Sequence, residues 1–205
     1  MELELQANGL AGSIPTQFGL FSDMIGNLFL YGNTLTQTVP SEIGQLTGMQ
    51  QQYLWDNSLV GTLPTELGSL TMLSFLDHPV NHFSGTVATE IGSLTGLTTF
   101  VLGANSFTGS LPTQLGSVTS AALRFELYSN LLTHTIPSEF GRLTSMSGTG
   151  LSSMGFNLRD NQLTGHVPTE LGKLTKISIR FDIYSNHLCG DLPTEVAELS
   201  SSVTT

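Results

Sequence analysis

The side chains with the most to offer a ligand are aromatic, and each keeps a fixed distance from an asparagine. All four tyrosines and the single tryptophan stand two or four residues before an asparagine. Tyr and Trp are enriched at binding hot spots because they combine a large, rigid surface with a polar group. The pattern favours a ligand-binding role, although strands also prefer aromatic residues for packing. The five residues are Tyr31, Tyr53, Trp55, Tyr128 and Tyr184.

Charged residues occupy related positions in the second half of the chain. Glu126 and Asp182 stand four residues before an asparagine, Arg159 stands two before, and Arg124 stands six before. We expect the aromatic residues to stack on a ligand at the N-terminal end and the polar residues to orient it at the C-terminal end. The candidate ligand-binding residues are Tyr31, Tyr53, Trp55, Arg124, Glu126, Tyr128, Arg159, Asp182 and Tyr184.

Catalytic motifs are missing from the sequence. It contains no G-x-S-x-G, no P-loop, no G-x-G-x-x-G and no H-E-x-x-H pattern. His78 and His82 are four residues apart, but Pro79 between them argues against a metal-binding pair on a helix. We therefore expect no enzymatic activity, no cofactor and no metal site.

Composition narrows the choice of partner. The formal net charge is −10 with 6 Lys+Arg, so the basic patch that nucleic acid requires is missing. No apolar run reaches the roughly 20 residues of a membrane helix, so we expect no membrane insertion of this segment. The first residues, Met1 to Glu4, do not form a signal peptide.

The asparagines mark an internal repeat. They recur at steps of 25, 24, 24, 24, 25, 31 and 25 residues, and motifs such as IPTQFG and LPTELG follow them. This regular period predicts a solenoid whose units bury their apolar faces on one another. The long step holds a Gly/Ser-rich insertion, SGTGLSS at 147–153, which we expect to form a surface loop. The asparagines are Asn8, Asn33, Asn57, Asn81, Asn105, Asn130, Asn161 and Asn186.

The consensus of these units, L-x-x-L-x-L-x-x-N-x-L-[TS]-G-x-[ILV]-P-x-[EQ]-[LIF]-G-x-L-T, resembles the plant-type leucine-rich repeat over the whole chain. The PTE-[LI]-G wording and the final NHLCGDLPTEVAELSSSVTT are most similar to leucine-rich-repeat proteins of diatoms and related algae. The resemblance implies one leucine-rich-repeat domain over 1–205, an α/β repeat solenoid shaped as a horseshoe of about eight repeats. A parallel β-sheet would line its concave side and short 3₁₀ or helical segments its convex side.

The resemblance also implies a function. We expect a non-enzymatic recognition module, secreted or at the cell surface, that binds a protein, peptide or glycan on its concave face. A structural scaffold subunit and a receptor ectodomain fragment are alternatives. Neither end carries a cap, so we expect a piece of a longer protein. In the resembled family a last-repeat cysteine often pairs with one in a C-terminal flank, so Cys189 has a possible disulfide partner beyond the C-terminus.

Periodicity within the repeat assigns the two faces of each strand. Residues five and three before the asparagine are mostly Leu, Phe or Ile, and positions two apart share a strand face, so these columns point inward. Positions two and four before must then face solvent. Gln52 and His78 fall inward, and Pro79 lies in a strand. A degenerate repeat with a local bulge is one interpretation, and a kink that shapes a notch beside Trp55 is the other.

A second candidate surface lies on the lateral strand after each asparagine. Thr and Ser recur there two residues apart, and residues i and i+2 share a strand face, so stacking of the repeats predicts a flat hydroxyl lattice of roughly 7 by 5 Å. Such arrays resemble those of ice-binding solenoids, so ice binding is an alternative function, although [TS]-G-[TS] is also ordinary wording for this repeat. The residues are Thr36, Thr38, Thr62, Ser84, Thr86, Thr108, Ser110, Thr133, Thr135 and Thr164.

Overall fold

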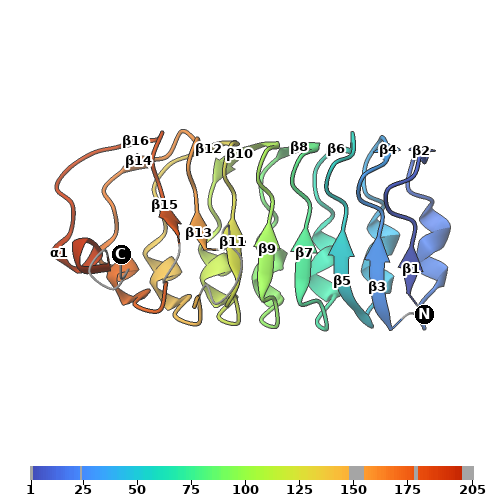
Figure 1. Cartoon of the computed structure of the whole chain (residues 1–205), viewed down its shortest axis with the longest axis horizontal. Helices are drawn as coiled ribbons and strands as arrows, with labels where there is room; N and C mark the ends of the chain where they lie inside the picture. Colours follow the sequence, from blue (N-terminus) through green and yellow to red (C-terminus); the bar gives the residue numbers. More distant parts are fainter. Residues whose placement is uncertain (1, 24, 148–154, 178–179, 200–205) are drawn as a thin grey trace.

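The computed structural model describes residues 2–23, 25–147, 155–177 and 180–199. Within these residues one parallel sheet runs the length of the molecule in the order β1-β3-β5-β7-β9-β11-β13-β15 (Figure 1). The strands therefore follow one another in space as they do in the chain, as predicted for a solenoid. Their bounds are β1 (Leu3–Glu4), β3 (Gly26–Phe29), β5 (Met49–Tyr53), β7 (Phe75–Asp77), β9 (Thr99–Val101), β11 (Arg124–Glu126), β13 (Phe156–Asn157) and β15 (Phe181–Asp182).

A second strand follows each asparagine on the lateral side. In the described part of the chain these strands pair in three groups, β12-β10-β8-β6, β14-β16 and β2-β4. Their bounds are β2 (Ala11–Gly12), β4 (Thr34–Leu35), β6 (Val60–Gly61), β8 (His82–Gly85), β10 (Ser106–Ser110), β12 (Leu131–Thr133), β14 (Thr164–Gly165) and β16 (His187–Leu188). The predicted insertion loop lies almost wholly at 148–154, outside the described residues.

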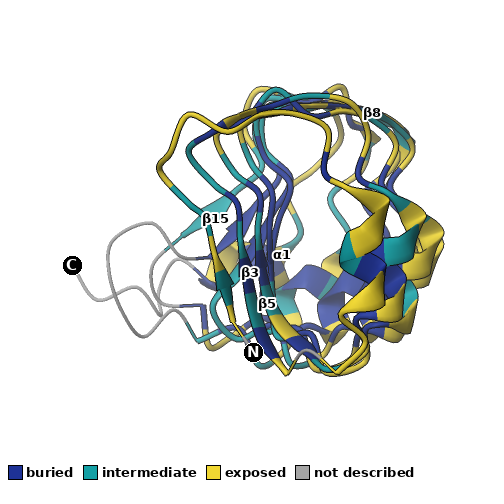
Figure 2. Cartoon of the chain, turned by 90° about the vertical axis from the view of Figure 1, so that its right-hand side faces the viewer, coloured by how far each residue is buried: buried dark blue, intermediate teal, exposed yellow. Residues whose placement is uncertain are grey.

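Short helices form the side opposite the main sheet, with their exposed residues outward and buried residues between the two layers (Figure 2). They are the 3₁₀ helices η1 (Thr16–Leu20), η2 (Ser41–Gln45), η3 (Thr65–Ser69), η4 (Thr89–Ser93), η5 (Thr113–Ser117), η6 (Ser138–Arg142) and η7 (Thr169–Lys173), and the α-helix α1 (Thr194–Ala197). A proline with φ between −58° and −70° precedes each helix except η4, where Ala88 adopts −65°. The motif proline therefore sets the entry to each helix, as predicted.

The motif glycine explains how closely the helices stack. A Cβ at Gly44 would overlap the backbone of Glu66 in the next repeat, and the same overlap would occur between Gly116 and Glu139. Glycine is therefore needed here for close approach of two backbones. This spacing lets each repeat bury its apolar residues against the next one.

The two inward columns form the core, as the periodicity predicts. In the middle of the molecule Leu76, Phe100 and Phe125 are register partners on adjacent strands, and each is fully buried. The rings of Phe125 and Phe156 stack at 5.6 Å with an interplanar angle of 7°. Aromatic stacking of this kind adds to the burial of apolar area along the solenoid.

The asparagines join neighbouring repeats through hydrogen bonds. Asn130 donates from Nδ2 to the carbonyl oxygens of Leu127 in its own repeat and Leu102 in the preceding one, both at 3.1 Å. Its Oδ1 accepts from the backbone N–H of Phe107 at 3.0 Å. Asn33, Asn57, Asn81, Asn105, Asn161 and Asn186 make the same kinds of bond. The predicted turn asparagine therefore satisfies backbone groups of two repeats.

The side chains of Gln52 and His78 lie in the core with no hydrogen-bond partner in the described structure. Both are fully buried, and neither polar atom of either side chain is paired. Burial lowers the pKa of His78 to about 3, because the charged imidazolium would lose its hydration. Their inward orientation was predicted from the strand period, and both positions raise the energy of the folded state.

Pro79 does not produce the local bulge that the sequence left open. The register from β5 through β7 to β9 is continuous. A register shift does occur in the pairing of β3 with β5, between Gly26 and Asn27, and this lies away from Pro79. Pro79 follows the end of β7 and still accepts a hydrogen bond from Asp56 N–H through its carbonyl oxygen. The missing proline N–H therefore leaves the register of the sheet unchanged.

Val80 carries local backbone strain that a substitution can relieve. The residue before each asparagine has a positive φ, and Val80 is a β-branched example at 57°. A left-handed conformation costs an L-residue about 1–2 kcal/mol, and asparagine tolerates it best after glycine. Because Val80 is half exposed, we expect Val80→Asn to raise the free energy of unfolding by about 1 kcal/mol. Urea unfolding measures this change.

Asp56→Asn is the matched control for this prediction. Asp56 occupies the same turn position at φ 55° and is exposed. Since aspartate already tolerates this conformation, its replacement should leave the stability unchanged. Equal effects of the two substitutions would show that Val80 is not strained.

Candidate ligand-binding face

Three of the predicted aromatic residues, Tyr31, Tyr53 and Trp55, gather at the ends of β3 and β5. The rings of Tyr31 and Trp55 stack at 4.2 Å with an interplanar angle of 12°. Tyr53 meets Phe29 at 4.8 Å and meets Tyr31 edge-on at 6.3 Å. These four side chains are half-buried. Packing of this kind fixes their rotamers before any ligand arrives.

Phe75 extends this cluster by one strand and was missed from the sequence. It lies at the start of β7 with its ring 6.2 Å from that of Tyr53. It stands six residues before its asparagine, the position that Arg124 occupies in its own repeat. That shared position was the signal that could have identified it.

The second cluster centres on Arg124. Its Nε and Nη2 donate to the two carboxylate oxygens of Glu126, both at 3.0 Å. Its Nη1 lies 3.5 Å from Oδ2 of Asp77. Asp77 is on β7, two strands from β11, so the Arg124 side chain crosses over β9. Arg124 and Glu126 were predicted to share the face, whereas the contact with Asp77 was not.

Asp77 is the least satisfied charged group of the cluster. It is 8% exposed, and its Oδ1 has no partner among the described residues. Burial raises the pKa of Asp77 to about 6, against the opposing attraction of Arg124. Burial and the nearby Asp77 carboxylate also raise the pKa of Tyr53. Tyr53 is the direct register partner of Asp77, so the aromatic and charged clusters meet here.

The expectation that every alternate strand position faces solvent was wrong in the middle of the sheet. Glu126, a predicted ligand-binding residue, is 3% exposed, and Val101 and Asn157 are also buried. Arg124 passes over β9, where Val101 lies, and covers Glu126 by pairing with it. Strand alternation determines the face of the sheet on which a side chain lies. Whether that side chain is exposed to solvent depends also on long side chains from neighbouring strands, such as Arg124.

The third cluster contains Tyr128, Arg159 and Tyr184. The Arg159 guanidinium carbon lies 5.1 Å from the ring centroid of Tyr128 and 5.8 Å from that of Tyr184. Arg159 also donates to Asp160 at 2.9 Å and to the Tyr184 hydroxyl at 3.1 Å. The guanidinium therefore stands between two aromatic side chains, an arrangement that cation–π attraction stabilises.

Two further observations complete the face. A Cβ at Gly103 would overlap the Tyr128 ring, so this ring lies over the neighbouring strand position. Asp182 pairs with Arg180, two residues earlier in the chain, rather than with the other predicted residues. Gly103 and Asp77 were therefore missed as members of the site, because their importance comes from contacts with other strands.

The lateral Thr and Ser positions differ in backbone conformation and in register from the simple lattice that their spacing predicts. The residue between the two hydroxyl positions has a positive φ, for example Gly85 at 74°, Gly109 at 76° and His134 at 65°. A residue with positive φ departs from regular strand alternation even inside a lateral strand, as Gly109 does in β10, so spacing alone does not place its two neighbours on one face. The register is also offset, because Ser84 pairs with Ser106 rather than with Thr108. The columns are therefore sheared between repeats.

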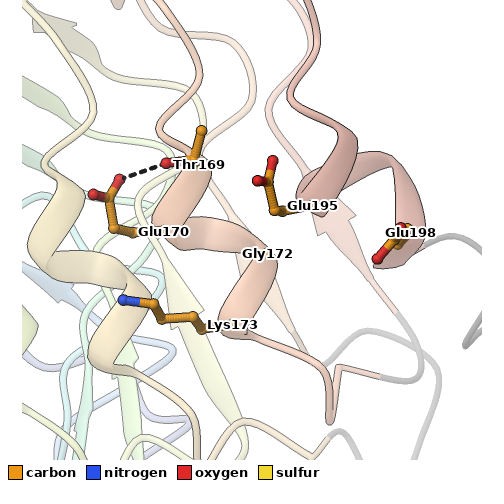
Figure 3. A pocket seen from close by; sticks show the side chains of 6 residues that line it. All are labelled: Thr169, Glu170, Gly172, Lys173, Glu195 and Glu198. Carbon is orange, nitrogen blue, oxygen red and sulfur yellow. Dashed lines mark hydrogen bonds between the residues drawn. The ribbon is translucent and has the colours of Figure 1, made fainter.

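Cys189 is a free, exposed thiol. No group of three metal-ligating side chains occurs among the described residues, and no helix described here is long and apolar enough to cross a membrane. A hollow of about 340 Å³ lies between η7 and α1, lined by Glu170, Lys173, Glu195 and others (Figure 3). It is on the helical side, away from the three clusters.

Comparison with known proteins places the fold. No family model and no curated protein matches the chain. Among solved structures, the plant peptide hormone receptor RGFR1 in complex with RGF2 is 32% identical, with a TM-score of 0.87 over 95% of this chain. The leucine-rich-repeat ectodomain of the Arabidopsis thaliana receptor kinase GASSHO1/SCHENGEN3, in complex with CASPARIAN STRIP INTEGRITY FACTOR 2, is 31% identical, with a TM-score of 0.86 over 96%.

These structures are much longer than this chain. The match covers 30% of the first and 22% of the second. A plant ice-binding protein is 24% identical, with a TM-score of 0.65 over 97% of this chain and 76% of its own, a likeness that shows the fold alone. The comparisons confirm the predicted leucine-rich-repeat solenoid.

Proposed function

We propose that this leucine-rich-repeat protein is a non-enzymatic recognition module that binds an extended peptide along its main sheet. The observation that supports this most is the continuity of the three clusters. They form one strip of aromatic and charged side chains from β3 to β15, here called the recognition strip. Its proposed ligand-binding residues are Tyr31, Tyr53, Trp55, Arg124, Glu126, Tyr128, Arg159, Asp182 and Tyr184, with Phe75 and Asp77 added from the structure.

The dimensions of the strip favour an extended ligand. The seven strands from β3 to β15, about 4.8 Å apart, span roughly 29 Å, the length of about eight extended residues. A small enclosed metabolite would use only a fraction of this surface. The similarity to RGFR1, a plant peptide hormone receptor, also favours a peptide.

Preorganisation supports binding over a purely structural role. Aromatic and arginine side chains lose conformational freedom on binding, which costs about 0.5–1.5 kcal/mol for each one. Here the rings already pack on each other, and Arg124 and Arg159 are held by hydrogen bonds. Much of this cost is therefore met during folding.

We propose that the whole of 1–205 is one leucine-rich-repeat domain, secreted or displayed at the cell surface, with diatom and algal proteins among its relatives. The exposed thiol of Cys189 is proposed to pair with a cysteine beyond the C-terminus. The offset register of the lateral strands and the positive φ between their hydroxyl positions do not favour ice binding.

Selection of peptides from a phage-displayed library tests the proposed function. A phage library of random dodecapeptides is panned on the protein, and selected peptides are synthesised for fluorescence polarisation. Removing Tyr53 and Trp55 together by alanine substitution should weaken binding by about 100-fold, because two hot-spot side chains are lost. The loss arises from the free aromatic surface of the strip.

Thr86→Ala/Thr108→Ala is the matched control on the lateral side, where both residues are exposed. It should change affinity by less than about twofold, since lateral contacts lie off the strip. Peptides that bind the Tyr53/Trp55 variant as tightly as the native protein would contradict the proposal, as would a library that returns no binder.

A further inference from the structure

The arginines of the recognition strip are already engaged by the protein's own carboxylates. Arg124 holds Glu126 with two hydrogen bonds of 3.0 Å. Arg159 pairs with Asp160 at 2.9 Å, and Arg180 pairs with Asp182. Within the described residues, no arginine of the strip keeps its full planar fork available for a carboxylate of a ligand.

Asp77 is in the opposite situation. Its Oδ1 has no partner in the described structure although the residue is 8% exposed. Its other oxygen meets Arg124 at 3.5 Å, longer than both bonds from Arg124 to Glu126. Two carboxylates share one guanidinium, so a second cation at Asp77 would balance the local charge. The raised pKa of this buried carboxyl group is consistent with that deficit.

The molecule itself shows how a cation is held on this surface. Arg159 lies between the rings of Tyr128 and Tyr184, 5.1 and 5.8 Å from their centroids. All three residues stand two before an asparagine on neighbouring strands. A guanidinium therefore fits between aromatic side chains of this outer column.

Pro79 occupies a similar place in the outer column, with aromatic residues near it but no cationic side chain at its own position. Asp56 N–H donates to the Pro79 carbonyl, and Val80 N–H donates to the Gly103 carbonyl, so Trp55, Pro79 and Gly103 occupy adjacent places in the column. Tyr128 lies over Gly103. Pro79 thus occupies the column position between Trp55 and Gly103, with the Tyr128 ring over Gly103. Asp77, two residues earlier on the same strand face, supplies the negative charge.

We infer that the peptide ligand carries a lysine or arginine side chain, which lies over Pro79 between Trp55 and Tyr128 and pairs with the Asp77 carboxylate. This inference rests on the proposed function. Asp77 is covered in the free protein, so the arriving cation displaces the contact from Arg124, the longest of the cluster. Arg124 keeps its pair with Glu126, and the net charge of −10 attracts a basic peptide from a distance.

The test compares Asp77→Asn with Asp56→Asn as panning targets for the dodecapeptide library. Both substitutions remove one negative charge near Trp55, but Asp56 is exposed and lies outside the proposed contact. The native protein and Asp56→Asn should select peptides with Lys or Arg fixed at one position. Asp77→Asn should lose that preference and bind the native-selected peptides at least about tenfold more weakly, the loss of one desolvated charge pair.

A substitution in the peptide gives an independent measurement that needs no protein variant. Norleucine in place of the basic residue should cause the same tenfold loss on the native protein and no further loss on Asp77→Asn. The inference is overturned if peptides that depend on Tyr53 and Trp55 show no basic preference, or if norleucine costs nothing. In that case the proposed function stands. Peptides that ignore both the aromatic residues and Asp77 would overturn both.

Discussion

Replacing Gln52 and His78 together by leucine is expected to raise the free energy of unfolding by about 4 kcal/mol. Both side chains are fully buried, and none of their polar atoms has a partner in the described structure. Each buried, unpaired polar group costs about 1–3 kcal/mol relative to water. Leucine removes that cost and matches Leu28 and Leu76, the register partners of Gln52.

Urea unfolding of the double variant and of each single variant measures the effect. Gln50→Leu is the control, because Gln50 is exposed on the same strand as Gln52. It should change stability by less than about 0.5 kcal/mol. A double variant no more stable than the native protein would mean that both polar side chains are satisfied in solution.

The same histidine predicts a pH dependence whose sign can be worked out. Its pKa is about 3 in the folded protein against an ordinary value of 6.5. Between these values the unfolded chain binds a proton that the folded chain does not. Stability is therefore lost as pH falls from 6.5 towards 3, at up to about 1.4 kcal/mol per pH unit. His78→Leu should remove this loss.

Asp77 has the opposite effect on the pH dependence of stability between about pH 6 and pH 3.8. Its pKa is raised from 3.8 to about 6 on folding, so the folded protein holds the extra proton and gains stability as pH falls through 6 to 3.8. Asp77→Asn should therefore steepen the acid loss, whereas His78→Leu should flatten it. Urea midpoints between pH 4 and 8 distinguish the two contributions. A native profile unchanged by His78→Leu would show that this imidazole titrates normally.

Asn130→Ala is expected to lower the free energy of unfolding by about 4 kcal/mol. The side chain is buried and bonds to Leu102 and Leu127 carbonyls and to the Phe107 N–H. Alanine leaves these backbone groups buried without partners, and each costs about 1–3 kcal/mol. Because the bonds join two repeats, the loss falls on the interface between them.

Asn8→Ala is the matched control for this substitution. Asn8 donates to the carbonyl oxygens of Leu5 and Gln6 at an exposed site, so its loss should cost less than about 1 kcal/mol. Hydrogen exchange gives a local measurement, since the Phe107 amide should lose protection in Asn130→Ala. An amide that stays protected would contradict the role assigned to this side chain.

The repeat pattern predicted most of the scaffold because its causes are local. A strand alternates faces every residue, so the inward and outward columns could be assigned from spacing, including the awkward burial of Gln52 and His78. Proline fixes its own φ, so the start of each helix could be assigned from the motif. The same reasoning is weaker on the lateral side, where the strands contain residues with positive φ such as Gly85, so alternation does not assign their faces.

The membership of the recognition strip could be predicted only in part. The columns of Tyr, Trp and Arg were visible, but Asp77 and Gly103 look unremarkable in sequence. Asp77 matters because Arg124 reaches it across 47 residues of sequence and two strands. Gly103 matters because the Tyr128 ring lies over it.

The sequence by itself therefore determined the solenoid, its register and the face from which each side chain leaves, because a period of about 24 residues and strand alternation act on neighbours along the chain. Only the tertiary structure decided which charges pair, which carboxylate stays unpaired and which outward residues are covered. Long side chains cross strands, and their reach depends on the rotamers of residues far away in sequence.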